Sequence, residues 1–183
     1  MKSIYFTAAT LDGFLADDDH SLDWLFAFGE AGQGGIDDFL DSLGAIAMGA
    51  STYEWLLRHE GYALPDAAKP WPYTQPTWVF THRTLPEVPG ADVRFVRGDV
   101  RPVHAAMADA ADGQNVWIVG GGDLAGQFYD AGLLDEIVVT IAPATLGRGK
   151  PLLPRRIESP ALRLVSADVL DGVFAQLTYA VSR

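Results

Sequence analysis

The sequence predicts an α/β fold, with a central, mostly parallel sheet flanked by helices and an antiparallel hairpin at its C-terminal end. Short β-branched or apolar runs alternate with segments of helical periodicity along most of the chain. Two strand-like runs, 162–169 and 174–181, then follow one another around a turn that contains Asp-Gly. Because no linker divides this pattern, residues 1–183 are expected to form a single domain.

Strands are expected wherever β-branched, aromatic or continuous apolar residues run together. The segment 4–10 is β-branched and aromatic, and the chain then turns at Asp12-Gly13. Segments 45–49 and 115–119 are short apolar runs, typical of strands that are buried on both faces. In chain order, the expected strands are 4–10, 45–49, 77–81, 93–96, 115–119, 136–141, 162–169 and 174–181.

Helices are expected between these strands. Apolar side chains at helical spacing predict a helix over 36–43, with Gly44 as its stop. Ser51 followed three residues later by Glu54 is the pattern of a capping box, so a second helix is expected to begin with Ser51 as its N-cap. The remaining helices are expected over 103–111 and 123–131. The acidic and glycine-rich stretch 17–35 and the proline-rich stretch 60–76 are expected to be loops that shape a substrate pocket.

Composition excludes several classes of function. Thirteen Lys and Arg against 24 Asp and Glu give a net charge of −11, which repels nucleic acid and anionic membranes. With no cysteine, the chain has no disulfide, thiolate nucleophile or Cys-ligated zinc. The four histidines are dispersed, so no metal site is expected. No apolar stretch approaches the ~18 residues of a membrane span, and we expect a cytoplasmic protein.

Three predicted strand ends are candidates for binding a phosphorylated ligand. Residues 120–122 are three glycines between a strand and a helix, where free N–H groups and the helix dipole favour an anion. Residues 49–52 follow another strand and add two hydroxyl groups, and residues 81–83 follow a third. Each pattern also has an ordinary structural explanation: a tight turn for 120–122, a capping box for 49–52 and a solvated loop for 81–83. Ligands of open α/β sheets bind outside the carboxyl ends of strands, so one long cofactor could use all three.

Acid–base candidates are fewer. Asp37, Asp38 and Asp41 lie near the start of a predicted helix, where carboxylates usually complement the helix dipole. Trp24 could shelter a flat ligand, although core packing is the commoner role of a tryptophan. The chain has no G-x-S-x-G motif, so acyl-transfer chemistry has no support.

Five segments together indicate a family. They are 8–16 (AATLDGFLA), 48–54 (MGASTYE), 120–128 (GGGDLAGQF), 132–136 (GLLDE) and 143–152 (PATLGRGKPL). In order and spacing they resemble the dihydrofolate reductase superfamily, and more closely the branch that contains the C-terminal reductase domain of RibD from riboflavin biosynthesis. The resemblance covers nearly the whole chain.

This resemblance implies NADPH as hydride donor, bound across the carboxyl ends of the strands. The cofactor contacts it implies are Ala8 and Ala9 at the nicotinamide carboxamide, Gly49, Ser51 and Thr52 at the pyrophosphate, Thr81, His82 and Arg83 at the adenosine ribose and its 2′-phosphate, Gly120, Gly121, Gly122, Asp123, Leu124 and Ala125 around the pyrophosphate and nicotinamide, and Gln127 near the adenine. Thr140 and Asp38 match substrate-pocket positions of folate reductases, and Trp24 is the third candidate substrate contact. Asp38 is also the candidate catalytic proton donor, with water as the alternative.

Some positions depart from the family pattern. Ala50 stands where the M-G-R motif has a phosphate-binding arginine, and Asp123 where folate reductases often have a cation. Ala125 replaces a tyrosine that packs at the nicotinamide. With these departures, Arg83 and Arg58 are the remaining candidates to bind the 2′-phosphate that distinguishes NADPH from NADH, because arginine is the residue that usually selects a phosphate.

The leading hypothesis is an NADPH-dependent reductase of a small heterocyclic or carbonyl-containing substrate, similar to the 5-amino-6-(5-phosphoribosylamino)uracil reductase domain of riboflavin biosynthesis. The chain lacks the cysteines of the zinc deaminase signature, so only the reductase half is expected. Two alternatives are a dihydrofolate reductase with altered loops and a nucleotide-binding module without turnover. The resemblance also implies a homodimer through the terminal hairpin and the loop 143–154.

Overall fold

The computed structural model of the chain describes residues 1–29, 31, 36–60 and 70–182. The strands are β1 (Ser3–Thr10), β2 (Phe14–Ala16), β3 (Leu43–Gly49), β4 (Thr77–Phe80), β5 (Val93–Val96), β6 (Asn115–Gly120), β7 (Glu136–Ala142), β8 (Lys150–Pro151), β9 (Leu162–Leu170) and β10 (Phe174–Val181). The helices are α1 (Asp23–Phe26), α2 (Ile36–Asp41), α3 (Ala50–Glu60), α4 (Val100–Ala111) and α5 (Gly122–Asp130).

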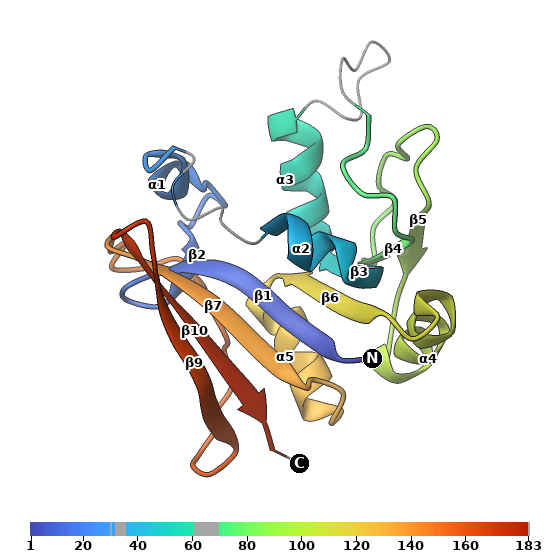
Figure 1. Ribbon diagram of the computed structural model, residues 1–183. Helices are drawn as coiled ribbons and strands as arrows, with labels where there is room; N and C mark the ends of the chain where they lie inside the picture. Colours follow the sequence, from blue (N-terminus) through green and yellow to red (C-terminus); the bar gives the residue numbers. More distant parts are fainter. Residues whose placement is uncertain (30, 32–35, 61–69, 183) are drawn as a thin grey trace.

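Eight of these strands form one sheet, in the order β5-β4-β3-β6-β1-β7-β10-β9 (Figure 1). The strands from β5 to β7 pair in parallel, whereas β10 pairs antiparallel with β7 and with β9. The short strands β2 and β8 form a separate antiparallel pair. The predicted α/β fold, with its mostly parallel sheet and C-terminal antiparallel hairpin, is therefore confirmed.

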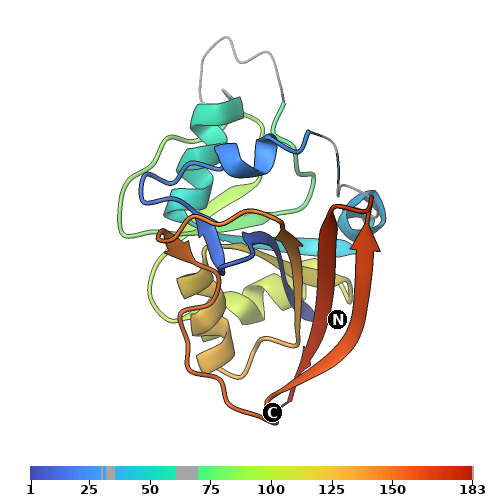
Figure 2. The same cartoon turned by 90° about the vertical axis from the view of Figure 1, so that its left-hand side faces the viewer.

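Helices cover both faces of the sheet. Figure 2 shows α2 on one side of the sheet and α5 on the other. Along β6, Val116 and Ile118 pack against α4 and α5, and Trp117 packs against the face that α2 and α3 cover. This alternation follows from the two-residue period of a strand, and burial on both faces explains why β6 reads as a continuous apolar run.

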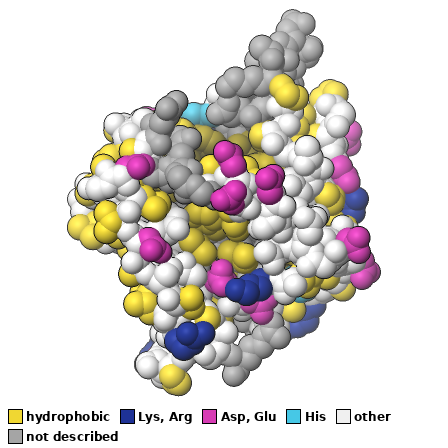
Figure 3. Space-filling view, viewed as in Figure 1, with side chains coloured by type: hydrophobic (Ala, Val, Ile, Leu, Met, Phe, Trp, Pro, Cys, Tyr) yellow, Lys and Arg dark blue, Asp and Glu magenta, His cyan; other side chains and the backbone are white. Residues whose placement is uncertain are grey.

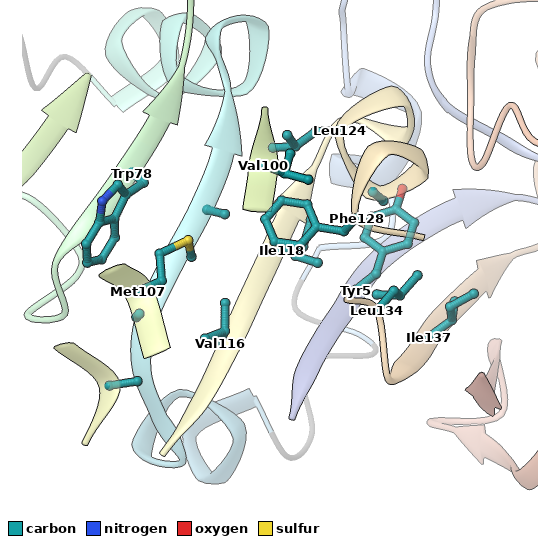
Figure 4. Close-up of a cluster of buried hydrophobic side chains, with 14 residues drawn as sticks. Tyr5, Trp78, Val100, Met107, Val116, Ile118, Leu124, Phe128, Leu134 and Ile137 are labelled. Atoms are coloured by element: carbon teal, nitrogen blue, oxygen red, sulfur yellow. The ribbon is translucent and has the colours of Figure 1, made fainter. Parts of the chain in front are cut away.

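The core beneath α4 and α5 surrounds one phenylalanine. Phe128 of α5 is fully buried, close to Ile118 of β6 and Tyr5 of β1 (Figure 4). Its ring contacts Phe80 and the imidazole of His104 edge to face, with centroid distances of 6.1 and 6.0 Å. Edge-to-face pairs of this kind add to the stability that burial already provides.

The structure corrects three predicted element boundaries. Gly44 lies inside β3 and does not end a helix; a Cβ there would collide with the backbone of Ala111, so close packing of β3 on α4 requires the glycine. Helix α3 begins at Ala50, which places Ser51 inside the first turn and not at the N-cap. Helix α4 begins at Val100 and not at residue 103. Asp99 caps it by accepting a hydrogen bond from the N–H of Arg101 at 2.9 Å.

Other differences concern the loops and edges. The short elements α1, β2 and β8 were not expected from the sequence. Much of the predicted glycine-rich loop 29–35 and of the proline-rich stretch 60–76 lies outside the described residues. Strand β9 is the last strand of the sheet and exposes Leu164, Val165 and Val169. The homodimer stays a prediction, which light scattering of the purified protein can check. Every helix in the described ranges is too short or too polar to cross a membrane.

Asp12 joins the turn after β1 to the loop that follows β7. Its carboxylate accepts hydrogen bonds from the hydroxyl of Thr10 at 2.6 Å and from the backbone N–H groups of Leu146 and Gly147 at 3.1 and 2.7 Å. These donors, the Thr10 hydroxyl foremost, lower the pKa of Asp12 below its ordinary value of 3.8. The ionised carboxylate therefore stabilises the folded state.

We expect Asp12→Asn to lower the melting temperature at neutral pH, because an asparagine offers one acceptor oxygen where the carboxylate offers two. The pKa of Asp12 is lower in the folded than in the unfolded chain. Its stabilisation is therefore complete above the unfolded pKa and is lost as the pH falls through the folded pKa. Melting curves followed by circular dichroism should show the two proteins converging as the pH is lowered below about 4. A difference that stayed constant over that range would contradict this assignment.

Candidate cofactor and substrate site

The three strand ends singled out in the sequence are neighbours in the structure, because the sheet order places β4, β3 and β6 side by side. A cavity of about 570 Å³ lies over the ends of β3 and β6. This volume is in the range of pockets that hold small molecules and cofactors. The predicted cofactor residues that line it are Ala8, Gly49, Ser51, Thr52, Gly120, Gly121, Gly122, Asp123, Leu124 and Gln127.

The N-terminus of α5 opens on this cavity. Gly121 is its N-cap and supplies no side-chain hydrogen bond, so the first N–H groups of the helix lack a capping side chain. Gly120 has φ +144°, a conformation that favours glycine. A Cβ on Gly122 would collide with the backbone carbonyls of Pro151 and Leu152, whereas Gly121 faces open space. The glycines therefore let β8 pack closely against the helix and leave its amides accessible to an anion.

Helix α3 contributes the second helix N-terminus. Ser51 and Thr52 lie in its first turn and line the cavity with their hydroxyl groups. The Cβ of an alanine at Gly49 would lie 3.6 Å from both the carbonyl oxygen of Gly120 and the nitrogen of Gly121, an ordinary contact. The two helix starts therefore meet across the ends of β3 and β6, an arrangement suited to a pyrophosphate.

Two basic side chains that the sequence motifs did not single out, Lys150 and His20, also line the larger cavity. Lys150 lies on β8 opposite Ala16 of β2, and its side chain has no ion pair among the described residues. Burial lowers the pKa of His20, and the positive charges of Lys150 and Arg58 lower it further. Lys150 is therefore the basic side chain of this cavity that would face an anionic ligand.

Asp123 is less repulsive to an anion than the sequence implies. Its carboxylate accepts hydrogen bonds from the guanidinium of Arg155 at 3.1 Å and from the side-chain amide of Gln127 at 2.9 Å. Arg155 also donates to Asp130 at 2.7 Å. The guanidinium lies where a side chain on Gly126 would be, which explains that glycine. Arg155 follows a proline in an irregular loop, so no motif or periodicity indicated its position.

The predicted 2′-phosphate site is already paired within the protein. Both guanidinium nitrogens of Arg83 donate to the carboxylate of Glu54 on α3, at 2.7 and 2.8 Å. Neither Arg83 nor its neighbours Thr81 and His82 line either of the two cavities. Phe80, the last residue of β4, does line the larger cavity, so the third strand end reaches it through Phe80 and not through the predicted residues 81–83.

A second cavity, of about 370 Å³, adjoins the first. Thr7, Ala8, Leu25 and Val119 line both, so the two spaces meet above β1 and β6. Thr140 of β7 lines the second cavity, next to Ala8 in the register of the sheet. The predicted substrate contact Thr140 therefore lines this second cavity.

Besides residues 81–83, four predicted site residues lie away from both cavities. Ala9 and Ala125 are buried in the packed interior. Trp24 is half-buried on α1, and its indole N–H donates to the carbonyl of Leu15 at 3.3 Å. Asp38 is exposed on α2 and does not line either cavity. The catalytic role proposed for Asp38 therefore gains nothing from the geometry.

Sequence reasoning missed the aromatic walls of the second cavity. Phe6 and Ala8 lie two residues apart on β1, and Trp117 and Val119 lie two residues apart on the neighbouring β6, so the two members of each pair face the same side of the sheet. This period of two was a usable signal, because residues of adjacent parallel strands that face the same way form one surface. Phe174 on β10 comes from the other end of the chain, and only the sheet order brings it to this cavity.

The larger cavity has the donors that a phosphorylated cofactor requires. The start of α5, the hydroxyl-bearing residues Ser51 and Thr52, and Lys150 all line it. The indole nitrogen of Trp55, which also lines the cavity, is buried without a hydrogen-bond partner among the described residues.

Comparisons with known proteins agree with the motifs. The sequence profile of the RibD C-terminal domain matches residues 61–174. The uncharacterized protein YwjB of Bacillus subtilis (strain 168) is 32% identical over 164 residues, which cover 89% of this chain and 88% of YwjB. A crystal structure of a putative riboflavin biosynthesis protein from Shewanella sp. PV-4 covers 100% of both chains, with a TM-score of 0.80 and 29% identity.

A more distant comparison concerns the fold alone. Dihydrofolate reductase from Enterococcus faecalis, in complex with NADP(H), matches 100% of this chain and 97% of its own, with a TM-score of 0.60 and 16% identity. The dihydrofolate-reductase-like fold and the resemblance to the RibD C-terminal domain are thereby confirmed. The chain belongs to the RibD C-terminal domain family.

Proposed function

We propose that this protein is an oxidoreductase that binds NADPH in the larger cavity and reduces a small heterocyclic or carbonyl-containing compound in the smaller one. The observation that carries the proposal is the junction of the two cavities at Thr7, Ala8 and Val119. A cofactor whose phosphates lie at the helix N-termini of the first cavity can present its reactive ring to the second. Membership of the RibD C-terminal domain family supports a reductase.

The chain's own residues would bind the cofactor and the substrate, orient them toward each other and exclude water from the site. The amides of α5 and the hydroxyls of Ser51 and Thr52 would donate hydrogen bonds to phosphate oxygens. The strand surface at Ala8 and Val119 forms a floor on which a flat ring can rest. When bound, a dihydronicotinamide supplies one hydride, and a proton from water completes the reduction of the substrate. Holding both rings in contact is the main contribution that the protein makes to the rate.

Titration with NADPH tests the first half of this proposal. Trp55 lines the larger cavity and Trp117 the smaller one, so binding should quench tryptophan fluorescence. No quenching at millimolar NADPH would overturn the proposal. Consumption of NADPH with a panel of pterins, aminouracils and quinones tests the second half. Turnover with dihydrofolate alone would favour a dihydrofolate reductase, and binding without any turnover would favour a nucleotide-binding module.

Replacing Lys150 by glutamine should weaken NADPH binding about tenfold, because a charge-assisted hydrogen bond to phosphate is lost. Arg148→Gln is the matched control: it removes a nearby positive charge, but the Arg148 side chain is 86% exposed and pairs with Asp18. Dissociation constants from fluorescence titration should differ between the two variants. Equal effects would mean that Lys150 acts only through the overall charge of the protein.

Replacing Glu54 by glutamine should free Arg83 from its ion pair. If Arg83 then reaches the 2′-phosphate, affinity for NADPH should rise about threefold, the size expected for an exposed pair, while affinity for NADH stays constant. The ratio of the two dissociation constants, measured on the wild type and on the variant, reports this effect. An unchanged ratio would place the 2′-phosphate away from Arg83.

A further inference from the structure

We infer that the smaller cavity accepts a planar, uncharged ring that carries no phosphate or carboxylate group. This inference rests on the proposed function, because it names the class of compound that would meet the reactive end of the cofactor. It differs from the phosphoribosyl compound that the resemblance implies. The walls of the cavity, its rim and its polar anchor each support it.

The walls are aromatic and aliphatic. Phe6, Trp117 and Phe174 form much of the lining, and the described lining residues carry no charge. A phosphate placed among these side chains would lose its hydration and gain no cationic partner.

The aromatic walls are held in fixed positions. Phe39 contacts the rings of Phe6 and Trp117 edge to face, with centroid distances of 4.7 and 5.5 Å. The indole N–H of Trp117 donates a hydrogen bond to the carbonyl of Phe6 at 3.0 Å. This N–H is therefore not available to a ligand in the cavity. The ring surfaces that remain for a ligand are apolar and flat, which suits another flat ring.

The rim of the cavity repels anions. Helix α2 lines the cavity through Ile36 and carries the exposed carboxylates Asp37, Asp38 and Asp41. Figure 3 shows acidic side chains over α2, directly beside an apolar hollow in the surface. A phosphate that reached out of the cavity toward this helix would meet negative charges. Such repulsion acts over about 8–10 Å in ordinary buffer.

The hydroxyl group of Thr140 can donate a hydrogen bond to a ligand in the cavity. The hydroxyl oxygen of Thr140 accepts a hydrogen bond from the side-chain amide of Gln176 on β10, at 3.1 Å. Because the oxygen is engaged as an acceptor, its own proton is available to a ligand. Thr140 is only 7% exposed, so a partner must come from the cavity it lines. A carbonyl oxygen or ring nitrogen on an uncharged ring fits this donor.

A matched pair of probes tests the inference: 1,4-naphthoquinone and 1,4-naphthoquinone-2-sulfonate. They share the ring and the carbonyl groups, and they differ by one negative charge. Because the chain has no cysteine, no thiol can add to either quinone. Binding is measured by tryptophan quenching in the presence of saturating NADP+, so that no turnover occurs. We expect the neutral quinone to bind at least tenfold more tightly than the sulfonate.

Charge variants identify the source of this preference. Asp37→Asn combined with Asp41→Asn should strengthen binding of the sulfonate severalfold and leave the neutral quinone unchanged. Asp109→Asn combined with Asp112→Asn removes the same charge at exposed positions of α4 and its C-cap, on the opposite face of the sheet, and should change neither affinity. Thr140→Val should weaken binding of the neutral quinone about threefold to tenfold, and Thr140→Ser should restore it.

The outcomes separate this inference from the proposed function. Equal or tighter binding of the sulfonate, with NADPH binding intact, would overturn the inference alone. If NADPH fails to bind while the neutral quinone is still preferred over the sulfonate, the proposed function fails and the assignment of the smaller cavity stands. If the two double aspartate variants reduced the preference for the neutral quinone equally, the carboxylates of α2 would have no specific role in it.

Discussion

Replacing Gly122 by alanine is expected to lower the melting temperature by about 6–12 °C and to abolish measurable NADPH binding. The added Cβ would collide with the backbone carbonyls of Pro151 and Leu152, which have no flexible side-chain end to move aside. Overpacking of this kind costs about 3 kcal/mol, which corresponds to that change of melting temperature in a protein of this size. Either β8 or the start of α5 must shift, and both line the larger cavity.

Gly49→Ala is the matched control for Gly122→Ala. It makes the same chemical change at the edge of the same cavity, but its Cβ would lie at an ordinary contact distance of 3.6 Å from its neighbours. Thermal melting and fluorescence titration of both variants separate the effects. A Gly122→Ala protein that melted like the Gly49→Ala protein and bound NADPH normally would contradict the packing of β8 against α5.

Replacing Phe128 by alanine is expected to lower the free energy of unfolding by about 3–5 kcal/mol. Phe128 is fully buried, and its ring contacts side chains from β4 and α4 as well as the strands beneath it. Truncation leaves a cavity that the surrounding rigid sheet fills poorly, so the loss exceeds the transfer free energy of the removed atoms. Urea denaturation followed by circular dichroism measures the change.

Phe128→Leu should cost much less than Phe128→Ala, because leucine refills most of the lost volume. If both variants lost the same free energy, the aromatic contacts would matter more than the volume. Phe26→Ala is a useful comparison, because Phe26 is 53% exposed and lines the smaller cavity. It should lower the affinity for a planar ligand with little loss of stability.

The strands of the large sheet were predictable from local sequence, because each is a short apolar run between turn-forming residues. Segments such as 115–119 and 136–141 lie within the observed β6 and β7. The short strands β2 and β8 were not predictable in this way, because segments of three and two residues are too short to show the alternation of a strand. Gly44 was misinterpreted because a glycine that ends a helix and a glycine that allows close packing look the same in one sequence.

The larger cavity was partly predictable. Glycines between a strand and a helix have a local physical meaning, so 120–122 and 49–52 could be predicted as candidate binding segments, and both line the larger cavity. Lys150 and Trp55 were missed because their side chains reach the cavity from elements whose neighbours are distant in the sequence. Arg83 was predicted to be a free phosphate anchor, and its pairing with Glu54, 29 positions away, depends on how α3 lies beside β4.

The sequence by itself determined the α/β class, the family, and the helix starts that favour an anion, because each can be recognised from short local patterns and from their order along the chain. The tertiary structure alone decided which strand ends adjoin, which charges are neutralised, and where the second cavity forms. Phe6, Trp117, Thr140 and Phe174 come from four strands, and only the strand order of the sheet brings them together. A pocket between distant segments depends on long-range packing, which the spacing of residues along one chain does not encode in a readable way.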